Sequence, residues 1–525
     1  MSMKRIVLLL SSLYLLIGCG GDKSSNSWAN FKPLNEIDKH IQGYYDASLG
    51  EAANPKSGNP AVYVDFSDGL IQAFTSSNIN KTLIRNVAEQ FGNSPKNEWW
   101  GLGKKAYSGV GKLEFGNNSN LLKAKIDDPN SYKDIYAPIE ESLKKITASS
   151  NDALLITDFE EYRMDNSEEV LDFASKYFID WIKKGNSITF KYSTYHEVNK
   201  LSKLPSDKNL YFIFFTYGKQ NDESLISQFT KSLLNTGVIP KTFELNNNPY
   251  TISNDYGGKD NTGIANHTFA KWVNFNFNAV IDKKLPYEVI GINKPWSEDL
   301  EKYVKNISEK EKGLFLSKLT LNAYDQSCFK LNKVALKVYD VSDDYEKFAR
   351  SNEAKNHIPV LTKNDKKDNV WDEKSKKDAI IKECYSSNSL ELKPEWVYKP
   401  ADLSSNEWPE IFDFDKEIFA GHLKNDPAKI SLNTVFHSNY KIKGIKKSNA
   451  LIRIDYIIED ASPNIENPLL NDFSWSSVIK KENGVNQSLY SAVKRTLQES
   501  TINPKGKIIY SYYIKFANAK KSETN

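Results

Sequence analysis

Two short apolar runs in the N-terminal half of the chain each end in side chains that can bind ions or transfer protons. The run at 61–64 is followed by Asp65 and Ser67, and the run at 153–156 is followed shortly by Asp158. Runs of this length, rich in β-branched and other apolar residues, are typical of buried strands. Open α/β sheets place ligand sites at the carboxyl ends of their strands. If the two strands are parallel neighbours, these side chains meet at one edge.

The elements around these runs alternate between helix and strand. Apolar residues at helical spacing lie at 79–91 and 135–146, and further apolar strands are predicted at 187–192 and 210–216. This alternation predicts an α/β domain with a doubly wound, mostly parallel sheet and helices on both faces. We assign that domain to residues 55–245.

The second half of the chain has a different pattern. Residues 246–274 are rich in Asn, Gly and Asp and are predicted to be a linker or an insertion. Beyond them, runs such as 451–458 and 508–516 alternate apolar and polar residues, which is typical of antiparallel strands with one face on a core. We therefore predict one or two β-rich α+β domains over residues 275–525.

Length and charge limit the class of protein. A chain of 525 residues predicts two or three domains. Its formal net charge of +3 comes from 70 basic and 67 acidic residues, without a basic block. Nothing in this balance calls for nucleic acid as a partner.

The N-terminus has the organisation of an export signal. A basic start precedes an apolar run at 6–17, which is too short for a transmembrane helix. The tetrapeptide Leu-Ile-Gly-Cys that ends at Cys19 resembles the lipobox of bacterial lipoproteins. The resemblance implies a signal peptide at 1–18 and a lipidated tether and leading segment at 19–54. Acyl chains on Cys19, palmitate among them, would anchor the chain in membrane lipid of the bacterial envelope, with the outer membrane expected and a periplasmic or surface-facing location.

The two acid-tipped runs resemble the motifs of the von Willebrand factor A domain. Asp65-x-Ser67-x-Gly69 corresponds to D-x-S-x-S, and Thr157-Asp158 to the first two residues of T-D-G. The resemblance implies a divalent ion, usually Mg²⁺, at the sheet edge, with Asp65, Ser67 and Asp158 as its ligands. An open coordination position would then accept an acid from a protein partner.

Three positions depart from that pattern. Gly69 replaces the second Ser, Ala137 lies where the family has a coordinating Thr, and Phe159 replaces the Gly of T-D-G. Mg²⁺ requires near-octahedral oxygen coordination, and glycine and alanine side chains offer no oxygen. The implied ion site is therefore degenerate.

Other interpretations of the same residues remain open. Asp65 and Asp158 could cap the helices that follow them. A carboxylate-based or metal-dependent hydrolase of glycosides or phosphoesters is the alternative function, with Trp99 and Trp100 in a loop as a sugar-stacking pair. The carboxylates available to it are Asp65, Asp68, Asp158, Glu160 and Glu161. A third possibility is an accessory lipoprotein that uses this domain only as a scaffold.

Cys328 and Cys384 are the other cysteines, and export permits a disulfide between them. Two buried free thiols are the alternative. The sequence favours an exported, lipid-anchored protein that binds a protein partner over an enzyme.

Overall fold

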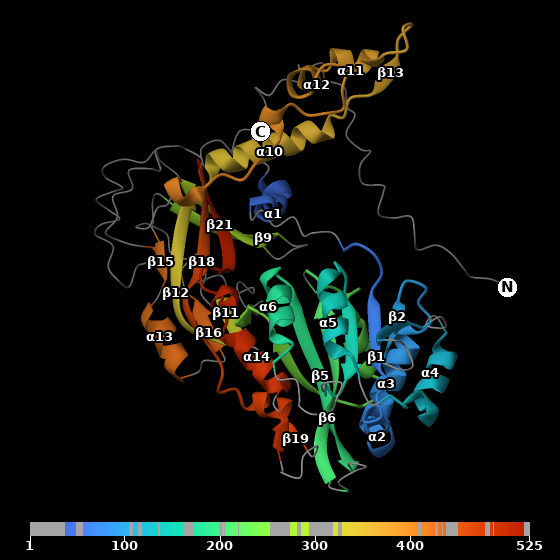
Figure 1. Cartoon of the computed structure of the whole chain (residues 1–525). Coiled ribbons are helices and arrows are strands. Elements are labelled where there is room, and N and C mark those ends of the chain that lie inside the picture. Colours follow the sequence, from blue (N-terminus) through green and yellow to red (C-terminus); the bar gives the residue numbers. More distant parts are fainter. Residues whose placement is uncertain are drawn as a thin grey trace, which may run out of the picture. The chain divides into compact units, whose positions relative to one another are not determined.

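The structure is a computed structural model of the whole chain (Figure 1). It describes residues 37–48, 56–103, 109–113, 118–134, 137–160, 172–198, 203, 205–218, 220–252, 273–280, 285–292, 319–323, 328–406, 412–414, 416–425, 429–432, 434–436, 450–477, 484–486 and 488–518. The predicted signal peptide and Cys19 lie outside these ranges.

A seven-stranded mixed sheet is built from residues 61–245, in the order β3-β2-β1-β4-β6-β5-β7. Its strands are β1 (Ala61–Asp65), β2 (Glu98–Gly103), β3 (Gly109–Lys112), β4 (Ala153–Thr157), β5 (Ser187–Val198), β6 (Pro205–Thr216) and β7 (Lys241–Leu245). β1 pairs in parallel with β2 and β4, and the other neighbours are antiparallel. β1, β2, β4 and β5 therefore share one direction, but β5 and β6 form a hairpin instead of a helical crossover.

Helices cover both faces of this sheet (Figure 1). On one face lie α2 (Leu70–Ser76), α3 (Asn78–Phe91), α4 (Ser119–Asp127) and α7 (Leu225–Leu233), whose apolar residues share a core with Val62, Val64, Phe212 and Phe214. On the other face lie α5 (Ile139–Ala148) and α6 (Ser175–Lys183), which pack on Tyr63, Leu155 and Ile213. Successive strand residues point to opposite faces, so a strand that is apolar throughout serves both cores. The prediction of an α/β domain with helices on both faces is confirmed at this level.

A five-stranded sheet follows, in the order β12-β18-β21-β10-β9. Its strands are β9 (Val273–Val280), β10 (Leu285–Ile292), β12 (Phe329–Asp340), β18 (Ala450–Pro463) and β21 (Ile508–Asn518). All neighbours are antiparallel except β10 and β21. α14 (Ser488–Gln498) lies against α6. Its apolar side chains belong to the same core as α5, α6 and the strands of both sheets.

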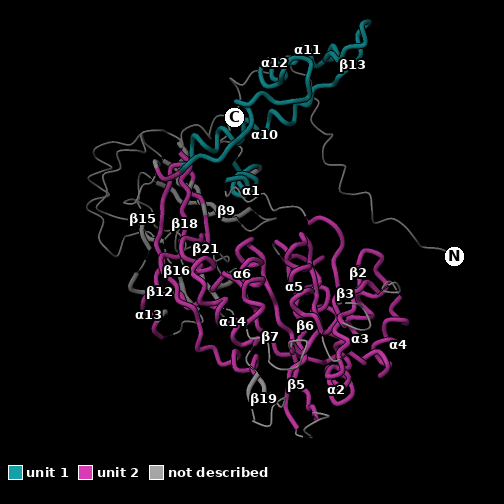
Figure 2. Tube along the Cα trace, viewed as in Figure 1, with its two compact units in different colours: residues 1–50, 341–402 teal, residues 51–340, 403–525 magenta. Residues whose placement is uncertain are grey.

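Smaller elements complete this part of the chain. They are β8 (Tyr250–Ile252), β11 (Leu319–Ala323) and β16 (Lys429–Leu432) in one sheet, the pairs β15 (Phe412–Phe414) with β17 (Thr434–Phe436) and β19 (Trp475–Ser477) with β20 (Gly484–Asn486), α13 (Lys416–Asn425), and the 3-10 turns η3 (Pro129–Ser131), η6 (Leu403–Asn406), η7 (Pro468–Phe473) and η8 (Ser500–Ile502). Together with the two large sheets they form one compact unit, residues 51–340 and 403–525 (Figure 2).

The second compact unit consists of residues 1–50 and 341–402 (Figure 2). Its described elements are α1 (Ile37–Ser48), α10 (Ser342–Asn356), β13 (Leu361–Lys363), β14 (Asn369–Trp371), α11 (Glu373–Lys377), α12 (Ala379–Cys384) and the 3-10 turn η5 (Pro394–Trp396). The hydroxyls of Tyr44 and Tyr398 both donate to Oδ2 of Asp344, at 2.9 and 2.8 Å. One buried carboxylate thereby ties α1 to a segment three hundred residues later in the chain.

This division differs from the predicted one at 275–525. The β-rich part shares a unit with the α/β domain, and residues 341–402 separate from both. The difference arises because α14 and η7 supply apolar side chains to the core on the α6 face of the first sheet. Among the described helices, none is long and apolar enough to cross a bilayer.

Candidate functional site

The two predicted strands lie side by side and end at the same edge of the sheet. β1 and β4 pair in parallel, with Val64 opposite Ile156. The hydroxyl of Thr157, the last residue of β4, donates to Oδ2 of Asp65, the last residue of β1, at 2.8 Å. The placement of Asp65 and Asp158 at one rim is thus confirmed.

Each acid organises the backbone directly after its own strand. Asp65 Oδ1 accepts a hydrogen bond from the Ser67 amide at 2.7 Å, and Asp158 Oδ1 accepts one from the Glu160 amide at 3.1 Å. These are Asx turns, in which an Asp side chain bonds the backbone two residues ahead. They are not helix caps, because the N-terminus of α2, which begins at Leu70, has no side-chain cap. The capping interpretation is therefore wrong for Asp65.

Phe159 has a backbone conformation that disfavours a bulky side chain. Its φ is 65°, in the left-handed region where glycine is the usual residue. The side chain is fully buried and stacks on Phe173, with ring centroids 5.3 Å apart. The amide of Phe159 donates to Thr157 Oγ1 at 3.0 Å, which fixes the turn. Strained residues of this kind cluster at functional sites.

A buried lysine faces the acids of this rim. Lys208 belongs to β6, three residues before Tyr211, which pairs with the end of β4. Its Nζ lies 2.7 Å from Glu160 Oε1 and forms an ion pair with Glu197 Oε2 as well. Only 7% of its side chain is exposed. No sequence pattern indicates Lys208 as a site residue.

The hairpin of β5 and β6 extends past the end of β4 and covers the rim. Tyr195 pairs directly with Lys208, so both side chains lie on one face, and the Tyr195 hydroxyl donates to Asp158 Oδ2 at 3.3 Å. The amide side chain of Gln72 in α2 bonds both the N–H and the C=O of Val198 at the end of β5. The hairpin is therefore fastened to the helix that follows Asp65.

Burial decides the protonation equilibria at this rim. It raises the pKa of Asp65 to about 6, while hydrogen bonds from Ser67 and Thr157 limit the rise. Burial also raises the pKa of Asp158 well above its usual value, and the neighbouring Glu160 adds to the effect. For Lys208, burial lowers the pKa, but Glu160, Asp158 and Glu197 together outweigh it, so that the pKa is raised and the ammonium is retained. The rim thus holds the Lys208 ammonium beside two aspartates, Asp65 and Asp158, whose burial disfavours ionisation.

The residues at this rim do not fit the divalent ion that the resemblance implies. Of the hydroxyl positions, only Ser67 is present, since Gly69 and Ala137 lack oxygen. A Cβ at Gly69 would lie 3.3 Å from Asp158 Oδ2, which leaves little room for a larger side chain. Within the described part of the chain, no group of three or more His, Cys, Asp or Glu side chains is arranged to hold a metal. Lys208 adds a positive charge that opposes a second cation.

Two carboxylates of the hydrolase interpretation and its tryptophan pair lie within the fold, while Glu161, a further carboxylate of that interpretation, lies outside the described residues. Asp65 and Asp158 are 0% and 3% exposed, so neither is available to a substrate as an acid or base. Trp99 and Trp100 lie on β2 and not in a loop, which corrects their prediction. Trp99 is buried, and Trp100 stacks on Tyr63 within the fold with ring centroids 6.1 Å apart. The tryptophans therefore serve packing.

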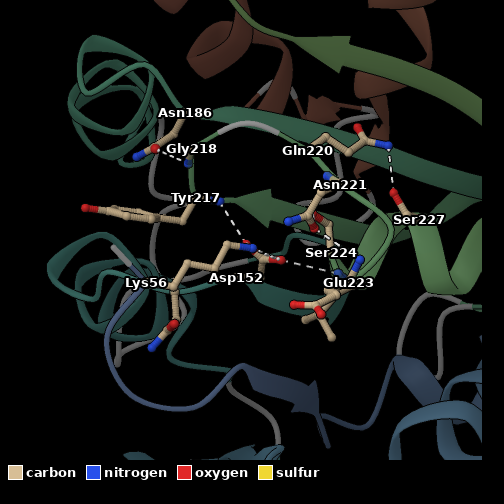
Figure 3. A network of polar contacts seen from close by, with 12 residues as sticks. Lys56, Asp152, Asn186, Tyr217, Gly218, Gln220, Asn221, Glu223, Ser224 and Ser227 are labelled. Atoms are coloured by element: carbon tan, nitrogen blue, oxygen red, sulfur yellow. Dashed lines mark hydrogen bonds and ion pairs between the residues drawn. The ribbon is translucent and has the colours of Figure 1, made fainter. Parts of the chain in front are cut away.

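The opposite rim of the sheet also has a buried acid, Asp152, which belongs to no predicted site. Asp152 precedes β4 and forms an ion pair with Lys56 at 2.8 Å (Figure 3). It also accepts hydrogen bonds from the amides of Tyr217, at 3.0 Å, and Leu225, the first residue of α7, at 3.3 Å. All of its contacts are structural, and an acid at a helix N-terminus is stabilising.

Cys328 and Cys384 do not form the predicted disulfide in the structure. The thiol of Cys328 donates to the Glu244 carbonyl at 2.9 Å, and burial raises its pKa to about 12. Cys384 is fully buried in a separate apolar cluster with Trp371 and Tyr385. Each thiol is enclosed in the core of its own unit.

An exposed apolar pocket lies in the unit that contains residues 341–402. Its volume is about 550 Å³. Tyr385 and Leu392 line it and pair in an isolated antiparallel bridge, while Ile358, Leu390 and Val397 at its margin are 67%, 55% and 44% exposed. Val397 also lines a neighbouring pocket of about 460 Å³. No sequence pattern identified this surface, because its residues come from irregular segments.

Comparisons of the chain with models of protein families, with curated proteins and with solved structures found no match.

Proposed function

We propose that this chain is an exported bacterial lipoprotein, anchored in the envelope membrane through acylated Cys19, that binds a protein partner. Its α/β domain is a von Willebrand A-like scaffold without an ion and without catalytic activity. The partner binds at the pocket formed by Ile358, Tyr385, Leu390, Leu392 and Val397, which we call the apolar pocket. The observation that carries this proposal is the exposure of large apolar side chains around that pocket.

Exposed apolar side chains gathered in one place favour association with another molecule. Ile358, Leu390 and Val397 border the same pocket, and Val360 nearby in sequence is 53% exposed. Grouped exposure of this kind is typical of binding surfaces, whereas scattered exposure is ordinary. Hydrogen bonds hold the wall in place, because Tyr385 donates to the Ala354 carbonyl at 3.0 Å. A wall that is already hydrogen-bonded needs less ordering when a partner binds.

The apolar pocket itself is lined by one basic and one acidic side chain, Lys355 and Glu391, and the other charged residues line its neighbour. Four basic and two acidic side chains line it and its neighbour: Lys347, Arg350, Lys355, Lys399, Glu391 and Glu395. Arg350 is paired with Glu346 at 2.7 Å, which leaves three lysines and two glutamates around the two pockets. We infer that the occupant is a protein segment with apolar side chains for the pocket and acidic side chains for the lysines.

The rim at Asp65 is a weaker candidate for this role. Its carboxylates are buried and bonded to neighbouring backbone, hydroxyl and ammonium groups, so they offer no coordination position to a partner. The rim supports the proposal only as part of the scaffold.

Site-specific photo-crosslinking in living cells tests the proposal. A photoreactive amino acid replaces Ile358 or Leu390 in the full chain, and Ile239, which is 92% exposed in the other unit, is the matched control position. We expect one discrete protein adduct from both pocket positions and none from Ile239. The adduct should weaken when Lys347→Glu and Lys399→Glu are introduced together.

Two outcomes contradict the proposal. The same adducts from Ile239 would mean non-specific contact. Crosslinks to lipid alone would assign the apolar pocket to the membrane surface instead of a protein.

A further inference from the structure

We propose that Lys208 takes the place of a divalent ion, so that this sheet edge carries a built-in cation and binds no metal. The von Willebrand A-like motifs imply an ion at this rim, and the residues present do not fit one. The disagreement has a physical explanation in the β5–β6 hairpin, which brings an ammonium group to the acids.

Lys208 pairs with two acids beside the implied ligands Asp65, Ser67 and Asp158, and so places its charge next to the ligand set. Its Nζ pairs with Glu160 Oε1 at 2.7 Å and with Glu197 Oε2. Glu160 follows β4, and Glu197 comes from β5, so the ammonium links the loop after β4 to the hairpin. The side chains of Lys208 and Glu197 are 7% and 9% exposed. Tyr195 donates to Asp158, which accounts for a further carboxylate oxygen.

The balance of charge makes the two cations mutually exclusive. A lysine ammonium offers three hydrogen-bond donors, enough for two carboxylates and one further acceptor. A divalent ion in the same cluster would be repelled by the ammonium at low effective dielectric. Conversely, removing the ammonium takes away the ion pairs that Lys208 makes with Glu160 and with the buried Glu197, which is destabilising. Their carboxylate oxygens are the hard ligands that Mg²⁺ and Mn²⁺ accept.

The inference is tested by replacing Lys208 with an uncharged residue and adding free divalent ions. The full mature chain is compared with Lys208→Met and Lys208→Arg by thermal unfolding and by calorimetric titration with MgCl₂ and MnCl₂. We expect no ion heat and no ion-dependent Tm for the wild type. Lys208→Met should lower Tm by about 10 °C, and millimolar Mg²⁺ or Mn²⁺ should restore several degrees. Lys208→Arg should resemble the wild type.

Two further variants keep the test decisive. Lys231→Met removes a lysine that pairs with Asp222 at the exposed surface, at 2.9 Å, and should leave Tm unchanged. Lys208→Met combined with Glu197→Gln removes one acid together with the cation, and should regain much of the lost Tm even if the single variant does not fold.

Three results would overturn the inference. They are Mg²⁺ binding by the wild type that Asp158→Asn abolishes, an unchanged Tm in Lys208→Met, and a double variant no more stable than the single one.

Discussion

Thr157 Oγ1 lies 2.8 Å from Asp65 Oδ2 and joins the carboxyl ends of two parallel strands. The same hydroxyl oxygen accepts a hydrogen bond from the Phe159 amide at 3.0 Å. One threonine therefore connects the end of β1 to the turn after β4. Both of its partners are buried, so neither can form a replacement hydrogen bond to water when the hydroxyl is removed.

Thr157→Val should destabilise the chain by about 2–3 kcal/mol, because the substitution keeps the shape but leaves a buried acceptor and a buried donor without partners. Urea unfolding followed by tryptophan fluorescence measures the loss. Thr194→Val is the control, since Thr194 is itself exposed and its hydroxyl donates to Asn209 Oδ1 at 2.8 Å. A loss no larger than that of the control would contradict the role of Thr157.

Asp65 should make the stability of the fold fall as pH rises. Its folded pKa of about 6 exceeds the ordinary value of 3.8, so its stabilising contribution is complete below about pH 4 and is lost as pH rises through 6. The loss is about 3 kcal/mol at most, from 1.36 kcal/mol per pKa unit. Asn does not titrate, so Asp65→Asn should gain stability relative to wild type between pH 4 and pH 7.

Urea unfolding at a series of pH values measures this difference between the two proteins. Asp222→Asn is the control, because Asp222 is an exposed carboxylate whose pKa is lowered by its bond to Lys231. A difference between Asp65→Asn and wild type that stays constant with pH would refute the raised pKa.

The meeting of Asp65 and Asp158 was predictable because local patterns determine it. β1 and β4 are short, apolar and flanked by helical segments, and such strands usually pair in parallel. Lys208 was not predictable in the same way. Residues 206–209 are polar and resemble a loop, and they become part of β6 only because each pairs with a residue of β5. Their burial depends on a hairpin that extends beyond the rest of the sheet.

Contacts between distant segments also limited the prediction of domains. The Tyr44 hydroxyl donates to Asp344, which lies three hundred residues later in the chain. No sequence pattern around either residue predicts this contact. Similarly, the apolar pocket is lined by residues such as Leu390 from a segment without helical or strand periodicity. Periodicity predicts elements, whereas the pairing of elements far apart depends on shape and burial.

At position 159, substitution by glycine should destabilise the chain no more than substitution by alanine. Phe159→Ala and Phe159→Gly both remove a buried ring and should cost about 3–5 kcal/mol. At φ 65°, however, glycine avoids strain of about 1 kcal/mol that alanine keeps. Phe159→Gly should therefore be at least as stable as Phe159→Ala in urea unfolding.

Phe178 in α6 provides the matched comparison. It is also fully buried, but its backbone is helical, so glycine there should be less stable than alanine by about 1 kcal/mol. The same order of stability at both positions would argue against strain at Phe159.

Cys328 and Cys384 should react as two free thiols once the chain is unfolded. Both are buried, so the native protein should react slowly with a thiol reagent. In denaturant without reductant, two thiols per mature chain should react, since Cys19 is expected to carry a thioether. Detection of none would restore the disulfide that the sequence first suggested. Cys384→Ser should reduce the count to one.

Cys19 should determine where the protein resides. Acylation of this residue would give a chain that incorporates labelled palmitate and partitions into the detergent phase, because several acyl chains anchor stably. Cys19→Ser should lose the label and retain the leader at 1–18, which increases its mass in gels. Cys328→Ser is the control, since a buried thiol in the folded unit should not affect acylation. Full labelling of Cys19→Ser would place the lipid elsewhere and refute the lipobox assignment.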